Sequence, residues 1–202
     1  MIGFRLPPVS EQDLAEAIRV YDSVEIEVRK RLPAIQLSAI VERTGALPAG
    51  HTIVSLAPAW DAILKVVRTH PDQIYSLTSE QWEEIVAASY DRAGFDEVIL
   101  TPRSGDFGRD VIAIKRGFYS IRIIDQVKAF RPGHVVTAND VRALLGVLQA
   151  DQQATKGVVT TTSTFAPKVA SDPFIAPFVP FRLELVDKNE LFTRLSSLGS
   201  QK

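Results

Sequence analysis

Residues 104–128 read SGDFGRDVIAIKRGFYSIRIIDQVK and contain two apolar runs on either side of a turn. Val, Ile, Tyr and Phe, which favour strands, dominate both runs, and Gly117 lies between them. Two such runs around a short glycine-containing turn are typical of a β-hairpin. We therefore predict strands over residues 110–115 and 119–130, joined near Gly117.

One end of this hairpin carries three residues whose side chains could take part in a reaction. Asp110 opens the first strand, and Gln126 and Lys128 share a face of the second because side chains alternate along a strand. The oxygens of Asp110 and Gln126 suit a hard divalent cation, and Lys128 could then stabilise charge on a phosphate or position a water. Taken alone, the spacing favours a plainer interpretation, in which Asp110 caps a turn, Gln126 is a polar strand residue and Lys128 lies on the surface.

The elements around the hairpin predict a mixed α/β domain. Thr78 and Gln81 form a capping-box pattern at the start of a helix, and Gly94 is placed to end it. The predicted order of elements is α-β-β-β-α-β, followed by a further strand and a helix. The further elements that we predict are strands over 97–100, 157–162 and 181–186 and helices over 139–149 and 189–195.

The first part of the chain has a different pattern. Apolar residues at helical spacing and punctuating prolines predict helices over residues 10–32, 35–41 and 58–70. The Gly-Ala-Leu-Pro-Ala-Gly run at 45–50 predicts a flexible joint. No chemical motif is found here. We therefore divide the chain into a mainly helical N-terminal segment, 1–76, and a second domain, 77–202.

Composition excludes several classes of protein. The 202 residues are 46% hydrophobic and carry a formal net charge of -1, which argues against a strongly basic nucleic-acid binder. The absence of cysteine excludes disulfides, a zinc–thiolate site and a thiol nucleophile, so a metal would be bound through oxygen or imidazole. No run is as apolar as a membrane span, and we expect a cytoplasmic protein with no membrane contact.

Several short motifs follow one another along the chain. They are TSEQWEE at 78–84, Gly-Phe at 94–95, SGDFGRD at 104–110, Gln-Val-Lys at 126–128 and VTTTSTF at 159–165. In this order, they resemble the Mrr-like restriction endonuclease branch of the PD-(D/E)XK nuclease superfamily over roughly residues 77–195. The resemblance implies a restriction-endonuclease-like core, a mixed sheet flanked by helices, with 1–76 as a helical extension.

The resemblance also implies roles for individual residues. Asp110 resembles the metal-binding aspartate, and Lys128 resembles the catalytic lysine. Gln126 stands where many members of the superfamily have Glu or Asp and where the Mrr-like branch commonly has Gln. Glu83 resembles a helix glutamate that supplements the metal ligands. The implied catalytic residues are thus Asp110, Gln126, Lys128 and Glu83, and the implied cofactor is Mg²⁺, for which Mn²⁺ can substitute.

Two positions depart from the family pattern. The catalytic lysine is often followed by a basic and an aromatic residue, but Ala129 and Phe130 follow Lys128 here. The residue before the glutamine is usually apolar, but it is Asp125 in this chain. Both departures leave the catalytic groups in place and bear on efficiency and substrate handling.

Further residues are candidates for contacts with DNA. Arg109 belongs to a cluster of cations around the hairpin, and Arg142 is similar to an arginine found on the same helix in relatives. Thr161, Thr162 and Ser163 could offer hydroxyls or amides to a phosphate, although threonines at a strand end equally reflect β-propensity.

As a whole, the resemblance implies a Mg²⁺-dependent DNA endonuclease that restricts foreign or modified DNA, as a homodimer or with a partner subunit. Three alternatives stay open: a structure-selective, junction-type nuclease; a cleavage-poor DNA-binding or interaction module on the same fold; and an adaptor whose function lies in residues 1–76. Residues 77–202 contain 15 Lys+Arg and 15 Asp+Glu. We therefore expect weak, strongly salt-sensitive DNA affinity from this domain.

Overall fold

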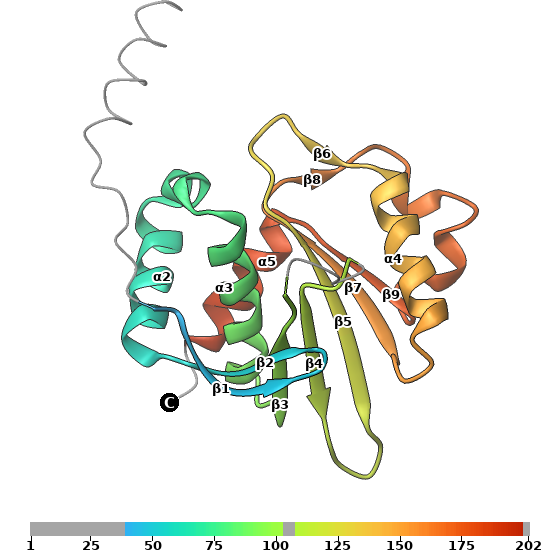
Figure 1. Ribbon diagram of the computed structural model, residues 1–202. Coiled ribbons are helices and arrows are strands. Elements are labelled where there is room, and N and C mark those ends of the chain that lie inside the picture. Colours follow the sequence, from blue (N-terminus) through green and yellow to red (C-terminus); the bar gives the residue numbers. More distant parts are fainter. Residues whose placement is uncertain (1–38, 103–107, 200–202) are drawn as a thin grey trace, which may run out of the picture. The chain divides into compact units, whose positions relative to one another are not determined.

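A computed structural model of the chain describes residues 39–102 and 108–199 (Figure 1). Its centre is a seven-stranded sheet with the strand order β1-β2-β3-β4-β5-β7-β9, and β6 and β8 form a separate two-stranded sheet. The strands are β1 (Val41–Leu47), β2 (Gly50–Ser55), β3 (Glu97–Leu100), β4 (Val111–Lys115), β5 (Ile121–Lys128), β6 (Val135–Val136), β7 (Lys156–Thr161), β8 (Thr164–Phe165) and β9 (Leu183–Val186).

In the described part of the chain, four α-helices accompany the sheets: α2 (Ala57–Thr69), α3 (Ser79–Arg92), α4 (Ala138–Ala150) and α5 (Lys188–Leu198). Short 3₁₀ turns cover Pro71–Ser76, Val169–Ser171 and Ala176–Phe178. Neighbouring strands from β1 to β5 pair antiparallel, whereas β5, β7 and β9 pair in parallel. A parallel pair needs a crossover, and α4 lies in the connection from β5 to β7. This mixed sheet with helices confirms the predicted α/β class.

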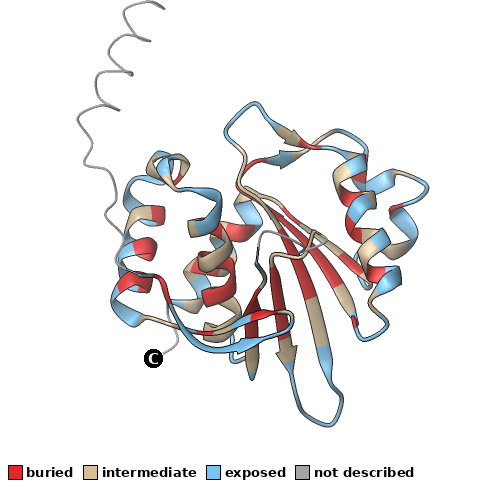
Figure 2. Cartoon of the chain, in the orientation of Figure 1, coloured by how far each residue is buried: buried red, intermediate tan, exposed pale blue. Residues whose placement is uncertain are grey.

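The strands of the sheet separate two apolar cores, as the buried residues in Figure 2 show. Alternation along β7 makes the division clear: Val158 packs with α2, α3 and α5, whereas its neighbour Val159 packs with α4. Along β5, Ile124 packs with the α4 core and Ile123 with the α3 core. Side chains at even-numbered positions of β5 therefore face α4, and those at odd-numbered positions face α3.

The predicted capping box at the start of α3 is confirmed. The Thr78 side chain accepts a hydrogen bond from the Gln81 backbone N–H at 3.2 Å, and the Gln81 side chain accepts one from the Thr78 N–H at 2.9 Å. The helix predicted at 58–70 is confirmed as α2, and the hairpin around Gly117 is confirmed as β4 and β5.

The prediction for residues 35–50 was wrong in its described part. Val41–Leu47 and Gly50–Ser55 are strands of a hairpin, where we predicted a helix over 35–41 that ends near Gly45 and a joint over 45–50. The cause is tertiary, because β2 extends the sheet by pairing with β3. Gly50 permits this close approach: its φ is +144°, and a Cβ there would lie 2.0 Å from the carbonyl oxygen of Leu100.

The described residues all belong to one compact unit that begins at Leu37. Strands from both sides of residue 77 thus share one sheet, and Trp60 of α2 shares a core with Trp82 of α3. The helix predicted over 10–32 lies outside the described residues, and the division at residue 77 stays a prediction. Within the described ranges, no helix is long and apolar enough to span a membrane.

Candidate active site

Asp110 lies at the end of the β4–β5 ladder. The register pairs Val111 with Asp125, and continuing it by one residue places Asp110 opposite Gln126. The Asp110 Oδ2 accepts a hydrogen bond of 2.6 Å from the Val127 backbone N–H. The Asp110 N–H in turn donates to the Asp125 carbonyl at 3.0 Å. These two bonds fix the carboxylate beside the part of β5 that carries Gln126.

Gln126 points to the α4 face and is only 8% exposed. Its Oε1 is buried and accepts no hydrogen bond. Gly108 lies against the amide, because a Cβ at residue 108 would come within 2.9 Å of the Gln126 Nε2. Gly108 also has a φ of +78°, which favours glycine. A buried carbonyl oxygen without a donor is costly, so this position is suited to a ligand that satisfies it.

Lys128 ends β5, and its side chain is about one quarter exposed, at 24%. Its Nζ lies 3.9 Å from the Asp140 Oδ1 at the start of α4. Asp140 is itself held by Thr137, whose N–H and Oγ1 donate to its Oδ2 at 2.9 and 2.7 Å. Partial burial opposes ionisation of Asp140, but the Thr137 hydrogen bonds and the charge of Lys128 outweigh it, so the pKa of Asp140 is lowered.

The threonine run at the end of β7 holds the segment that follows Lys128 in place. The Thr161 Oγ1 donates to the Lys128 carbonyl at 2.8 Å, and the Thr162 Oγ1 donates to the Phe130 carbonyl at 2.8 Å. The Ser163 Oγ donates to the His134 carbonyl at 2.6 Å. All three side chains are buried, and their hydroxyl protons are used inside the protein. The structure thus shows a positioning role, and their contact with DNA stays a prediction.

The two arginines that we expected at DNA are engaged with carboxylates. Arg109 lies 3.8 Å from Asp151, which also pairs with Arg122 at 3.3 Å. Arg142 forms an ion pair with Asp172 and donates to the Asn139 side chain at 2.7 Å. A phosphate would have to compete with these partners, and both arginines stay predictions as DNA contacts.

Glu83 is half-buried in the second turn of α3. This helix packs on the Asp125 face of the sheet, whereas Gln126 points to the α4 face. The Glu83 side chain could therefore approach Asp110 only by passing the ends of the strands. Its place in the site stays a prediction.

Asp110 and Gln126 supply oxygen donors of the kind that a hard divalent cation takes. Among the described residues, no group of three or more His, Cys, Asp or Glu is gathered for a metal ion. The residues nevertheless fit a cation such as Mg²⁺, because it commonly uses one or two carboxylates and keeps waters or phosphate oxygens as its other ligands. The unpartnered Oε1 of Gln126 matches the neutral ligand of such a set.

Asp125 is an unexpected feature of the opposite face. It is 1% exposed, and its Oδ2 accepts hydrogen bonds from Tyr90 at 2.8 Å and Thr160 at 2.9 Å. Burial is the largest effect and raises the pKa of Asp125 to about 8, although both hydrogen bonds oppose it. The side chain lines a cavity of about 300 Å³ between the sheet, α3 and α5. The sequence signal was an acid at a position that apolar neighbours predict to be buried.

Asp140 was also missed as a neighbour of Lys128. The Thr-x-x-Asp spacing from Thr137 to Asp140 could have identified the helix cap. The contact with Lys128 could not be read from the sequence, because the α4 N-terminus reaches the end of β5 only through the tertiary fold.

Comparisons with known proteins give a family match and similar solved structures. One family model matches residues 74–195, that of Mrr_cat, which is described as a restriction endonuclease. Among solved structures, the chain is similar to the MspJI restriction endonuclease in complex with a 27-mer oligonucleotide, with 15% identity and a TM-score of 0.43. It is also similar to the DNA modification-dependent restriction endonuclease AspBHI, with 19% identity and a TM-score of 0.49.

These similarities cover only part of each solved structure. They include 68% of this chain and 30% of the MspJI chain, and 72% of this chain and 37% of the AspBHI chain. The chain thus spans about a third of the length of either relative. A search among curated proteins gives no match.

Proposed function

Because the family model covers more than half of the chain, the protein belongs to the Mrr_cat restriction endonuclease family, and on that premise we propose that it is a Mg²⁺-dependent DNA endonuclease. The proposed reaction is hydrolysis of phosphodiester bonds, and the proposed role is restriction of foreign or modified DNA. One observation carries the assignment of the site. The buried Oε1 of Gln126 has no partner on a strand end that also carries Asp110 and Lys128.

In this mechanism, Asp110 and Gln126 would hold the cation through their side-chain oxygens. A bound Mg²⁺ would supply charge neutralisation at the phosphate and a more acidic water for the hydrolysis. Lys128 places its ammonium at the same strand end, where it stabilises the negative charge that develops on the phosphate oxygens. Asp140, fixed by the Thr137 cap, limits the positions that the Lys128 ammonium can take. Glu83 is a further proposed carboxylate ligand.

One site of this kind cuts one strand. Cleavage of both strands of a duplex therefore requires a second site, which favours a homodimer or a partner subunit. Homodimers with two-fold symmetry are the commonest protein oligomers. The two-fold axis would place two identical sites on the two antiparallel strands of DNA.

A plasmid-nicking assay tests this proposal. Supercoiled plasmid, methylated or unmethylated, is incubated with the protein and Mg²⁺ or Mn²⁺. We expect the wild type to nick or linearise the plasmid, and Asp110→Asn and Lys128→Met to lower the rate by at least about 100-fold, the scale of a lost transition-state contact. The matched controls are Asp61→Asn and Lys65→Met, which change exposed residues of α2.

The assay can contradict the proposal in two ways. Nicking that survives both active-site substitutions, in folded protein, would show that the chemistry lies elsewhere. Duplex binding by a wild type that cleaves no plasmid would favour the cleavage-poor DNA-binding module. The residues of the strand end support this second candidate, because Gln126 is neutral and Ala129 stands after Lys128 where a basic residue is common in the family.

A further inference from the structure

A lysine or arginine is most available to a DNA phosphate when its side chain has no partner inside the protein. Most lysine and arginine side chains in residues 39–102 and 108–199 bind a carboxylate, a hydroxyl or a backbone carbonyl. Among the lysines and arginines of these two ranges, three exposed side chains have no hydrogen bond or ion pair: Lys65, Arg131 and Lys168. Lys65 lies on α2, far along the chain from the catalytic strands. Arg131 and Lys168 flank the small sheet formed by β6 and β8.

This small sheet lies beyond the ends of the central strands that carry the site (Figure 1). Three peptide units separate Lys128 from Arg131, so their α-carbons are within about 11 Å of each other. At the other end of the small sheet, the Ala166 N–H donates to the Val136 carbonyl at 2.8 Å, two residues before Lys168. Arg131 and Lys168 thus belong to one structural unit beside the catalytic end of β5.

The segment that carries Arg131 is held in place. Its neighbour Phe130 packs on His134 with ring centroids 4.2 Å apart, and the His134 N–H donates to the Arg131 carbonyl at 3.1 Å. The hydroxyls of Thr162 and Ser163 bind the carbonyls on either side. Since the backbone is already ordered, a contact made by Arg131 costs little further backbone entropy.

Lys168 holds an unfavourable backbone conformation. Its φ is +69°, the left-handed region, and among the described residues no other non-glycine has a positive φ. An L-residue is strained there, and glycine or asparagine would be the favoured choice for folding. A lysine at such a position is a reason to look for a function outside the fold.

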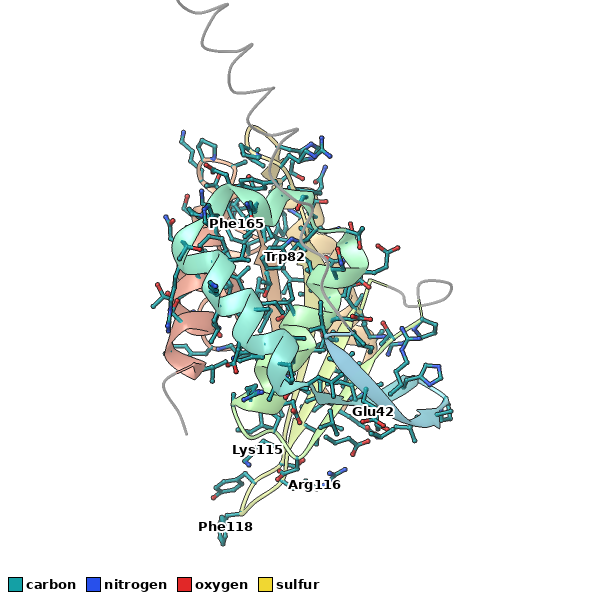
Figure 3. All side chains as sticks on the ribbon, turned by 90° about the vertical axis from the view of Figure 1, so that its left-hand side faces the viewer. Glu42, Trp82, Lys115, Arg116, Phe118 and Phe165 are labelled. Carbon is teal, nitrogen blue, oxygen red and sulfur yellow. The ribbon has the colours of Figure 1, made fainter. Side chains whose placement is uncertain are left out.

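Other cations are less suited to this role. Lys115 and Arg116 lie at the opposite end of the β4–β5 hairpin, near Phe118 and away from Phe165 of β8 (Figure 3), and they pair with Asp96 and Glu97. Arg109, Arg122 and Arg142 are paired with Asp151 and Asp172, as described above.

We propose that the β6–β8 sheet is a DNA-backbone clamp, in which Arg131 and Lys168 bind phosphates beside the catalytic strand end. This inference deepens the proposed nuclease function and rests on it. The clamp explains how a domain with balanced charge can bind DNA: side chains that neutralise phosphates release the counterions condensed on the DNA, and two unpaired cations flank this small sheet.

The test measures binding in the absence of cleavage. A fluorescein-labelled duplex of about 30 base pairs is titrated with full-length protein in EDTA, over a salt range of about 50 to 200 mM. Arg131→Ala and Lys168→Gly are expected to weaken binding several-fold and to reduce the salt slope, d log K/d log[salt], by about one each. Lys65→Ala, which removes the third unpartnered cation, is the matched control and should leave both quantities unchanged.

Lys168→Gly separates binding from folding. Glycine relieves the strain at φ +69°, so its melting temperature should equal or exceed that of the wild type while its DNA affinity falls. Unchanged affinity and salt slope in both clamp variants, an equal loss in Lys65→Ala, or no duplex binding by the wild type would each overturn the clamp.

The two proposals fail in different ways. A wild type that binds duplex through Arg131 and Lys168 but cleaves none with Mg²⁺ or Mn²⁺ contradicts the nuclease function and keeps the clamp. A wild type that cleaves with unchanged binding in the clamp variants contradicts the clamp and keeps the nuclease.

Discussion

At the scale of single residues, the two faces of β5 separate two kinds of polar side chain. Gln126 and Lys128 face α4 and belong to the candidate active site, whereas Asp125 faces α3 and is buried in the core. Sequence alternation predicted this separation correctly. Alternation could not predict how deeply Asp125 is buried, because its burial depends on the packing of α3 and α5 on that face of the sheet.

Asp125 gives a prediction for stability against pH. Its pKa is raised to about 8 in the folded protein, so folding favours the protonated acid. This contribution is complete below about pH 4 and is lost as pH rises to about 8, with a slope of up to about 1.4 kcal/mol per pH unit. Asp125→Asn keeps the acceptor for Tyr90 and Thr160 but cannot ionise, so it should be more stable than the wild type at pH 8 and similar at pH 4.

Urea unfolding from pH 4 to pH 8 measures the difference between the two proteins. The exposed Asp61→Asn serves as the control, and its difference from the wild type should stay constant across this range. A constant difference for Asp125→Asn as well would mean that Asp125 is ionised throughout in the folded protein.

At the scale of elements, the β1–β2 hairpin forms strands although the local sequence pattern predicts a helix, because strand pairing in the tertiary structure outweighs the local preference. Apolar residues near 35–41 fit helical spacing, but Val41 and Ile53 are buried as parts of strands. β2 pairs with β3, a strand that lies more than 40 residues later in the sequence. A strand that gains its partner at such a distance carries little local signal.

Gly50 makes the pairing of β2 with β3 testable. Gly50→Ala would place a Cβ 2.0 Å from the Leu100 carbonyl oxygen and hold alanine at φ +144°. The backbone conformation alone should cost about 1–3 kcal/mol of unfolding free energy, and the contact with Leu100 adds to this cost.

Gly146 is the matched control in α4, because a Cβ there meets no atom within 4 Å. Gly146→Ala should stabilise the protein by about 0.5–1 kcal/mol, as expected for alanine in a helix interior. Both variants can be compared by urea unfolding, and an equal effect of the two substitutions would contradict the steric role of Gly50.

At the scale of the whole molecule, the sheet continues across the division that the sequence predicted at residue 77. β1, β2 and α2 precede this position, and Trp60, Ile63 and Leu64 of α2 are buried in the core that includes Trp82. The family match begins at residue 74 and therefore leaves out two strands of the seven-stranded sheet.

A pair of truncations tests this arrangement. A chain that begins at residue 39 keeps every described element and should unfold cooperatively. A chain that begins at residue 77 loses β1, β2 and α2, exposes the α3 core, and should melt at a much lower temperature or aggregate. Equal melting temperatures, measured by circular dichroism, would instead support an independent domain over 77–202.

The sequence by itself determined the β4–β5 hairpin, the capped helix before it, the α/β class and the family, because these follow from local alternation, capping and motif order. It also determined that Asp110, Gln126 and Lys128 would lie toward one end of the hairpin, since period-two alternation and a tight turn leave few alternatives. The tertiary structure alone decided the unpartnered Gln126 oxygen, the Asp140 contact to Lys128, the burial of Asp125 and the choice of unpaired cations. Each of these depends on groups far apart in sequence, and only the packing of helices on both faces of the sheet brings those groups together.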